Sequence, residues 1–278
     1  VVGPATGGLN PDLPVRGPLS DALRSIGEMP GKSRFGNAFI FAFAGHDTTG
    51  LTLSWLIFEL AQNKQIQRRL QREVDDFYEM LNGRDMAYDD LKSLKFMTKC
   101  IMETLRLWVI VPNGTFREIE FDDYIKGPSG ENVKIPKGTL CQITNYCRHR
   151  DPKLWGEDVD VFNPDRDWKD NEIWHNEGFR AYNPQSERFS PFTFTPRDCI
   201  GKNFAQMEMR AILCNVVKDY SFELSDAAAA YDPSNFLGIN YGTMGPQDLT
   251  LPEKVKTDGP FPERVQVGLR VRPVRRQK

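Results

Sequence analysis

Hydrophobic and polar positions in the first part of the chain follow helical periods. Residues 35–63, FGNAFIFAFAGHDTTGLTLSWLIFELAQN, are apolar on nearly every side except for a polar interruption from Gly45 to Thr49. An aspartate at the centre of a membrane-spanning helix costs about 2.5–3.5 kcal/mol, so we expect a long helix buried inside a soluble protein. Glycine weakens a helix and threonine can bond back to the preceding turn, so the polar interruption predicts a local distortion.

Two further helices follow in the pattern. One has apolar residues at helical spacing and ends near Asn82: Ile66, Leu70, Val74, Phe77 and Leu81. The next is expected within residues 91–109, with Leu94, Ile101 and Leu105 on its apolar side, and must end before Pro112.

The pattern changes after residue 110. Short β-type runs punctuated by Gly and Pro occupy residues 111–147, and residues 148–198 form a long irregular connection. Helical spacing then returns at Ile200, Phe204, Met207, Ala211 and Cys214, and Val265, Val267, Leu269 and Val271 alternate as in a half-buried strand.

These elements predict one mainly α domain with small β-sheets (α+β). Its expected parts are a loop or short helix (1–32), a helical region (33–110), a β-rich region (111–147), an irregular connection (148–198), a helix (199–220), and terminal strands and loops (221–278).

Composition narrows the class of protein. The net charge is −2, from 36 basic and 38 acidic residues, so no strong field favours nucleic acid or a membrane surface. The five cysteines contain no C-x-x-C pair, which argues against a disulfide framework or a zinc knuckle and fits a reducing compartment. The opening VVGPATGGLNPDLPVRGP has neither a signal sequence nor an anchor.

Candidate chemistry begins at Cys199, which precedes the last predicted helix. Unpaired N–H groups and the helix dipole at that end favour a thiolate, which is a metal ligand. Gly201 would allow a flat cofactor to approach, and Arg197 could pair with an anionic group on it. Taken alone, a single cysteine is more often a small buried hydrophobe.

Two other groups of polar residues stand out. Asp47 and Thr48 place an acid beside an alcohol in an apolar helix, which suits either a groove for a small ligand or a packing irregularity filled by water. His46 is expected to be a structural or surface residue. Glu103 and Arg106 are three residues apart and share a helix face, where an exposed pair is worth about 0–1 kcal/mol, and Arg166 could bring a second guanidinium to Glu103.

In this order, the segments resemble the cytochrome P450 family of haem-thiolate monooxygenases over about residues 19–272. The matching runs are A-G-x-D-T-T at 44–49, E-x-x-R at 103–106, IPKGT followed by HRDPKLWGEDVDVFNPDR, and F-x-x-x-x-R-x-C-x-G at 192–201.

The resemblance implies a role for each candidate. Cys199 would be the axial ligand of the iron of haem b, and Asp47 with Thr48 would relay protons. The remaining residues would support the site: Phe192 near the thiolate, Gly201 beside the porphyrin, Arg197, Arg117 and His149 as partners of the haem propionates, and Glu103, Arg106 and Arg166 as a buried ion triad that acts in folding.

The resemblance also implies an activity and partners. The enzyme would insert one oxygen atom from O2 into a lipophilic small molecule of secondary or xenobiotic metabolism. Its electrons would come from NADPH through a separate reductase, or from a ferredoxin. The sequence style is eukaryotic, of fungal type, which implies the cytosolic face of the endoplasmic reticulum membrane. Two alternatives are a non-oxygenase haem-thiolate enzyme, against which Asp47 and Thr48 argue, and a truncated haem-binding remnant without activity.

Three departures from the family pattern matter. Thr195 stands where the cysteine loop usually has glycine, and a β-branched residue there is strained if the turn needs a positive φ. Asp165 stands where the P-E-R segment has glutamate. Family members also carry a comparable length of chain ahead of the long helix, including the membrane anchor, so we expect this chain to be a C-terminal part.

Overall fold

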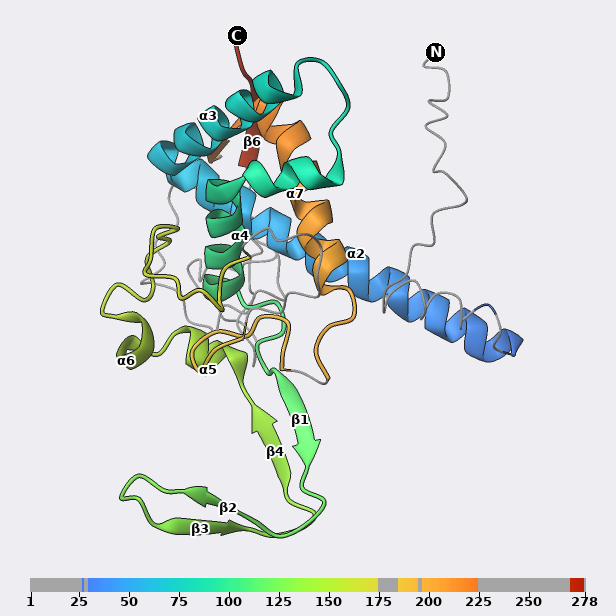
Figure 1. Cartoon of the computed structure of the whole chain (residues 1–278), viewed down its shortest axis with the longest axis vertical. Helices are drawn as coiled ribbons and strands as arrows, with labels where there is room; N and C mark the ends of the chain where they lie inside the picture. The colour runs from blue at the N-terminus through green and yellow to red at the C-terminus, as the bar shows by residue number, and fades with distance from the viewer. Residues whose placement is uncertain (1–26, 28–29, 175–184, 195–196, 225–270, 278) are drawn as a thin grey trace, which may run out of the picture. The chain divides into compact units, whose positions relative to one another are not determined.

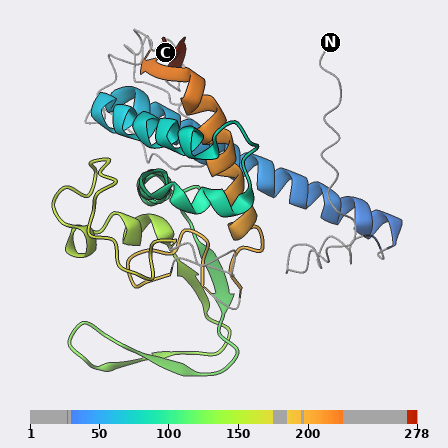
Figure 2. The same ribbon diagram turned by 45° about the horizontal axis from the view of Figure 1, so that its top comes forward.

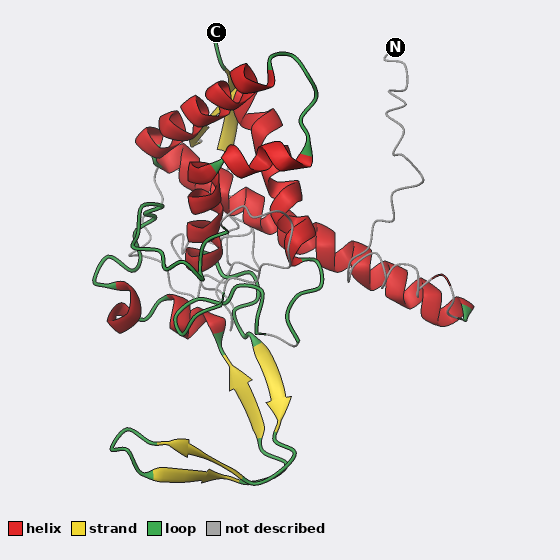
Figure 3. Ribbon diagram, in the orientation of Figure 1, coloured by secondary structure: helices red, strands yellow, loops and turns green. Residues whose placement is uncertain are grey.

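The computed structural model describes residues 27, 30–174, 185–194, 197–224 and 271–277 (Figure 1). Most of these residues are helical, and the strands form small antiparallel pairs, as Figure 3 shows. The predicted α+β fold class is therefore confirmed. A boundary between two compact units falls between His46 and Asp47, inside the first long helix.

That helix, α2 (Gly31–Gln62), runs without interruption through its polar centre, so the predicted distortion is wrong. Just after the polar centre, two hydroxyls donate to main-chain carbonyls one turn earlier in the same helix. Thr52 Oγ1 donates to the Thr48 carbonyl at 2.8 Å, and Ser54 Oγ donates to the Gly50 carbonyl at 2.8 Å. Such bonds add to the helical ladder without replacing it.

The two halves of α2 differ in burial. Trp55, Leu56 and Leu60 are fully buried in the second half. In the first half, four large apolar side chains are between 50% and 75% exposed: Phe35, Phe39, Ile40 and Phe43. The expectation of a helix buried along its length is therefore not met at these four residues. None of the described helices is long and apolar enough to cross a membrane.

The helical core contains α3 (Lys64–Leu81), the 3-10 helix η1 (Tyr88–Ser93), α4 (Lys95–Leu107) and α7 (Lys202–Asp219). Helix α3 contacts both α4 and α7, and α3 and α7 lie side by side in both views (Figures 1 and 2). The predicted stripe of α3 is buried at Leu70, Val74, Phe77 and Leu81. The helix ends at Asn82 in the left-handed conformation (φ 48°), where the sequence predicted its end.

Helix α7 buries a face that matches the predicted one only in part: Cys214 is fully buried, but the first predicted positions are not. Ile200, just before the helix, and Phe204 are 44% and 47% exposed, whereas Gln206 and Arg210 are buried. Arg210 is accommodated because it donates to the hydroxyl of Thr98 at 3.0 Å and to the Gln206 carbonyl at 2.6 Å. These hydrogen bonds satisfy the buried guanidinium of Arg210, a polar group that a hydrophobic pattern would place on the protein surface.

The β-rich region predicted after residue 110 is present. Strand β1 (Thr115–Glu118) pairs with β4 (Leu140–Ile143), and between them β2 (Asp123–Lys126) pairs with β3 (Asn132–Ile135). Two short helices follow in the connection, α5 (Asn145–His149) and α6 (Pro152–Trp155).

Strand β5 (Tyr220–Leu224) pairs with β6 (Val271–Arg275), and Phe222 lies opposite Pro273. The side-chain amide of Gln67 bonds to Phe222 as a neighbouring strand would: its Oε1 accepts from the Phe222 N–H at 2.7 Å, and its Nε2 donates to the Phe222 carbonyl at 3.0 Å. Of the strand predicted at the C-terminus, Val271 begins β6, and Val265, Val267 and Leu269 lie outside the described residues.

Candidate functional site

The segment before α7 folds into a loop that carries Cys199, which we call the cysteine loop (residues 190–201). Its described part is held by main-chain bonds: the Thr193 N–H donates to the Ser190 carbonyl at 3.0 Å, and the Cys199 N–H donates to the Phe192 carbonyl at 2.9 Å. The second bond closes the loop and brings the main chains of Phe192 and Cys199 together, and the role of the Phe192 ring beside the thiolate remains a prediction. Phe192 is partly buried against the hydrophobic core.

The backbone of this loop is strained at Thr193. Its φ is +66°, a region that β-branched residues rarely adopt. The Thr193 hydroxyl donates to the Arg197 carbonyl at 3.1 Å across the loop, which helps to hold this conformation. Thr195, where the sequence predicted strain, lies outside the described residues.

Opposing effects act on the pKa of the Cys199 thiol. Cys199 is an exposed residue, but the protein around its sulfur is dense enough for burial to raise its pKa. The backbone N–H groups of Gly201 and Lys202 and the charge of Lys202 lower the pKa but do not outweigh burial. The helix end thus favours the thiolate, but burial outweighs this effect and the net pKa is raised. Coordination to a metal ion removes a thiol proton outright.

The residues around Cys199 suit a metal ion that receives most of its ligands from a cofactor and only one from the protein. Among the described residues, no group of three or more His, Cys, Asp or Glu side chains could hold a metal ion. A Cβ added at Gly201 would lie 4.0 Å from the Cys199 sulfur and meet nothing closer, so glycine keeps the space beside the sulfur open. A single thiolate with open space beside it fits an iron that is already held in a flat ring.

Two guanidinium groups are available for an anionic group of such a cofactor. Arg197 is exposed, and no described residue gives its side chain a hydrogen bond or an ion pair. Arg117 lies on β1 and donates to the neighbouring Phe116 carbonyl at 2.8 Å, with no carboxylate partner in the described part of the chain. Both residues therefore remain predicted partners of the propionates.

His149 is placed differently from the other predicted propionate partners. It is fully buried at the end of α5, and its Nε2 accepts from the Ser190 N–H at 3.1 Å. Burial first, and then the nearby charges of Arg148 and Arg106, hold its pKa well below the usual range, so the imidazole is neutral. A buried neutral ring is a poor partner for a carboxylate, and this geometry favours a role in holding the loop.

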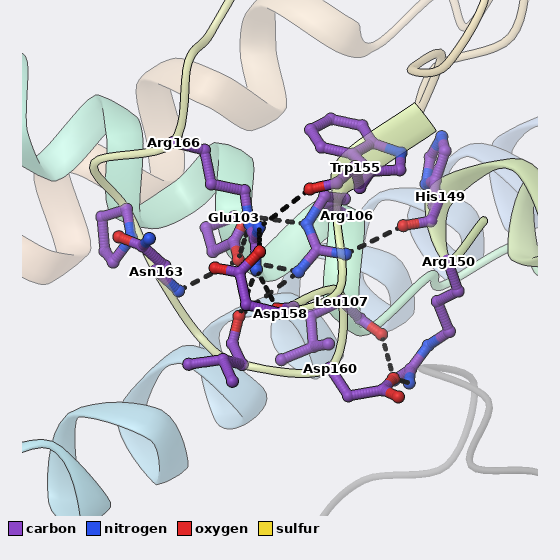
Figure 4. Close-up of polar contacts among 12 residues, drawn as sticks. Glu103, Arg106, Leu107, His149, Arg150, Trp155, Asp158, Asp160, Asn163 and Arg166 are labelled. Carbon is purple, nitrogen blue, oxygen red and sulfur yellow. Dashed lines mark hydrogen bonds and ion pairs between the residues drawn. The ribbon is translucent and has the colours of Figure 1, made fainter. Parts of the chain in front are cut away.

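The three ionic residues predicted to meet do so in the structure (Figure 4). Arg106 binds both oxygens of Glu103 at 2.8 Å, and Arg166 Nε binds Glu103 Oε1 at 2.8 Å. Glu103 and Arg106 have no exposed side-chain surface, so the alternative of a solvated surface pair does not hold.

Main-chain groups complete this buried network. The Asn163 N–H donates to Glu103 Oε1 at 3.0 Å, Arg106 Nη1 donates to the His149 carbonyl at 2.8 Å, and Arg166 donates to the Asp158 carboxylate at 2.9 Å (Figure 4). Burial works against the charge of Arg166, but Glu103 and Asp158 outweigh it and raise its pKa. The triad thereby joins α4 to α5 and to the connection that leads toward Cys199.

Asp47 and Thr48, the predicted acid and alcohol, lie in α2. Asp47 is exposed and Thr48 is half-buried, at consecutive positions of an unbroken helix. The predicted groove at this point has no counterpart in the helix geometry, and the roles of both residues remain predictions. His46 is exposed, as a surface histidine would be.

Two features of the structure were missed by sequence reasoning. Glu59 is buried in α2, where its Oε1 accepts from the Trp108 indole N–H at 2.8 Å. The Trp108 ring stacks on Trp55 with centroids 3.6 Å apart. The lone acid in the apolar run LIFELA was a signal that could have been read. The second feature is Ser190 with its α5 partners, which no local pattern marks because they are about 40 residues apart.

Comparison with known protein sequences identifies the family. The sequence model of the cytochrome P450 family matches residues 35–240. The chain belongs to the cytochrome P450 family, and the family resemblance predicted from the motifs is confirmed.

Individual relatives are eukaryotic. The chain is 34% identical over 190 residues to cytochrome P450 CYP13A5 of Caenorhabditis elegans, covering 68% of this chain and 33% of the relative. It is 35% identical over 173 residues to cytochrome P450 4F8 of Homo sapiens (62% and 30%) and 34% identical over 183 residues to cytochrome P450 4V2 of Rattus norvegicus (66% and 32%). The chain thus spans about a third of the length of the curated relatives it matches.

Proposed function

We propose that this chain carries the haem-binding and oxygen-activating residues of a monooxygenase that acts on a lipophilic small molecule. The observation that carries the proposal is the cysteine loop: a single sulfur beside Gly201, at the start of α7, with backbone donors and the exposed Arg197, whose side chain has no carboxylate partner among the described residues. Family membership supports a haem-thiolate oxidoreductase in general.

Cys199 would hold the iron, and Arg197 with Arg117 would hold the haem propionates. When bound, haem supplies the activation of dioxygen and its transfer to a C–H bond. The N–H groups of Gly201 and Lys202 lower the pKa of the Cys199 thiol and would stabilise the negative charge of its thiolate. The space beside Gly201 lets the ring approach, since no side chain stands there.

Asp47 and Thr48 would supply protons. The Asp47 carboxylate is exposed to water, and a neighbouring hydroxyl such as that of Thr48 can both accept and donate a hydrogen bond. General acid–base groups of this kind contribute about 10²–10⁴-fold to rate. Thr48→Ala is therefore expected to lower NADPH-driven turnover, measured with an added reductase, by about 10²-fold while the haem spectrum is unchanged.

The buried triad of Glu103, Arg106 and Arg166 would act in folding and not in the reaction. Electrons would come from NADPH through a reductase, or from a ferredoxin. The whole protein would lie on the cytosolic face of the endoplasmic reticulum membrane. The lipophilic substrate is consistent with apolar residues in the turn before β1, where Val111 is 44% exposed.

The decisive experiment is optical. The purified chain is reconstituted with haem, reduced and exposed to carbon monoxide, and the Soret band is recorded for wild type, Cys199→Ser and Cys147→Ser. Cys147 is the matched control because it is also an exposed cysteine. We expect the red-shifted band of thiolate ligation in wild type and Cys147→Ser and its loss in Cys199→Ser. A band retained in Cys199→Ser, or absent from wild type, would overturn the proposal.

A further inference from the structure

Helix α5 contacts the start of the cysteine loop through three of its five residues. Asn145, Arg148 and His149 all bond to Ser190, which is itself fully buried. The Ser190 N–H donates to His149 Nε2 at 3.1 Å, and its hydroxyl lies 3.4 Å from Asn145 Oδ1 and receives a bond from Arg148. Ser190 is thus fixed through both its main chain and its side chain.

Ser190 is also where the loop begins. Its carbonyl accepts from the Thr193 N–H, and the next closure joins Cys199 to Phe192. Arg148 additionally lies over the ring of Phe194, 5.3 Å from its centroid. A shift of Ser190 would therefore be passed to the residues that hold Cys199.

The other end of His149 is tied to the buried triad. Its carbonyl accepts from Arg106 Nη1 at 2.8 Å, and Arg106 binds Glu103 through two bonds (Figure 4). His149 therefore contacts the triad through its main chain and the cysteine loop through its ring. Because Nε2 accepts a hydrogen bond, the ring proton resides on Nδ1, and the main chain of Leu105 is among the groups that act on the pKa of the ring.

We propose that His149 is a positioning residue: its carbonyl is held by the Glu103–Arg106 pair, and its ring anchors Ser190 and thereby fixes the loop that presents Cys199. This replaces the predicted role of His149 as a propionate partner. Its significance for catalysis rests on the proposed function of Cys199 as the iron ligand. The anchoring itself concerns only the chain and is tested without cofactor.

The test measures how fast Cys199 is alkylated. Cys141 and Cys147, the other cysteines that are not buried, are first replaced by serine, and Cys100 and Cys214 remain as buried reporters of global unfolding. The cofactor-free chain is treated with iodoacetamide under native conditions, and mass spectrometry gives the labelling rate of each cysteine.

His149→Leu removes the acceptor of the Ser190 N–H, and His149→Gln keeps an acceptor near the position of Nε2. Loss of one buried hydrogen bond shifts a local opening equilibrium by about five-fold, so Cys199 labelling should accelerate by about that factor in His149→Leu. The rate should return toward wild type in His149→Gln, and Cys100 and Cys214 should stay protected in both variants.

Ser190→Ala is the matched control, because it deletes the hydroxyl and keeps the N–H that His149 accepts. We expect it to change the Cys199 rate less than His149→Leu does. An unchanged rate in His149→Leu, equal acceleration in the Leu and Gln variants, or labelling of all three cysteines together would overturn the proposal. Failure of haem to bind Cys199 would leave this result untouched and would count only against the proposed function.

Discussion

Glu103 and Glu59 are both buried glutamates, yet the chain treats their charges in opposite ways. Glu103 faces two guanidinium groups, from Arg106 and Arg166. Glu59 is only 4% exposed, and its hydrogen-bond donors are neutral: the Trp108 indole at 2.8 Å and the Asn63 amide at 3.2 Å.

The difference shows what neutral donors can and cannot do. Burial and, to a smaller extent, the charge of Glu103 raise the pKa of Glu59, whereas Trp108, Arg150 and Asn63 lower it only in part, and the resulting pKa is about 7. A buried carboxylate needs an opposite charge as well as hydrogen bonds, or it takes up a proton instead. Glu103 is therefore suited to be a fixed charge, and Glu59 is suited to change protonation near neutral pH.

The largest expected effect comes from removing the fixed charge. Glu103→Gln leaves Arg106 and Arg166 buried without their shared counter-ion, which should lower the free energy of unfolding by about 3–5 kcal/mol. Urea unfolding followed by circular dichroism measures this, with Glu118→Gln on the exposed side of β1 as the control. A Glu103→Gln midpoint equal to that of the control would show that the triad does not stabilise the fold.

A smaller, pH-dependent effect is expected at Glu59. In the unfolded chain this carboxyl ionises near 4.5, and in the folded chain near 7, so the folded state holds the proton longer and loses stability as pH rises through that window. The full shift corresponds to about 3 kcal/mol. Glu59→Gln cannot ionise, so it should match wild type at about pH 4 and exceed it in free energy of unfolding at about pH 8 by up to about that amount. Equal pH dependence in the two proteins would contradict the comparison.

The smallest effect concerns the neutral donor. Trp108→Phe deletes the indole N–H that lowers the pKa of Glu59, so it should cost about 1 kcal/mol more at pH 8 than at pH 5. Repeating the substitution in the Glu59→Gln background separates this bond from the loss of ring volume. The pH dependence of the Trp108→Phe cost should vanish there, and its persistence would assign the cost to packing alone.

Local patterns predicted much of this fold, and contacts between distant segments account for the failures. Alternating charges and apolar residues marked α3, and the E-x-x-R spacing marked Glu103 and Arg106. Part of the buried face of α7 was missed because Arg210 reaches Thr98, 112 residues away. The contacts of His149 with Ser190 were missed for the same reason. The sequence pattern of one segment shows the periodicity of that segment. It does not show which hydrogen-bond partners a distant segment supplies to its polar side chains.

Gln67 has a consequence for association between molecules. A two-stranded ribbon exposes rows of N–H and carbonyl groups to which a foreign strand can pair. At Phe222 the amide of Gln67 already occupies both groups, Lys64 adds a donor to the carbonyl at 2.6 Å, and across the ribbon Pro273 has no N–H to offer. The side chain of Gln67 thus caps the edge of this sheet. Replacing Gln67 with leucine would free the Phe222 N–H to pair with a strand of another molecule, which favours self-assembly.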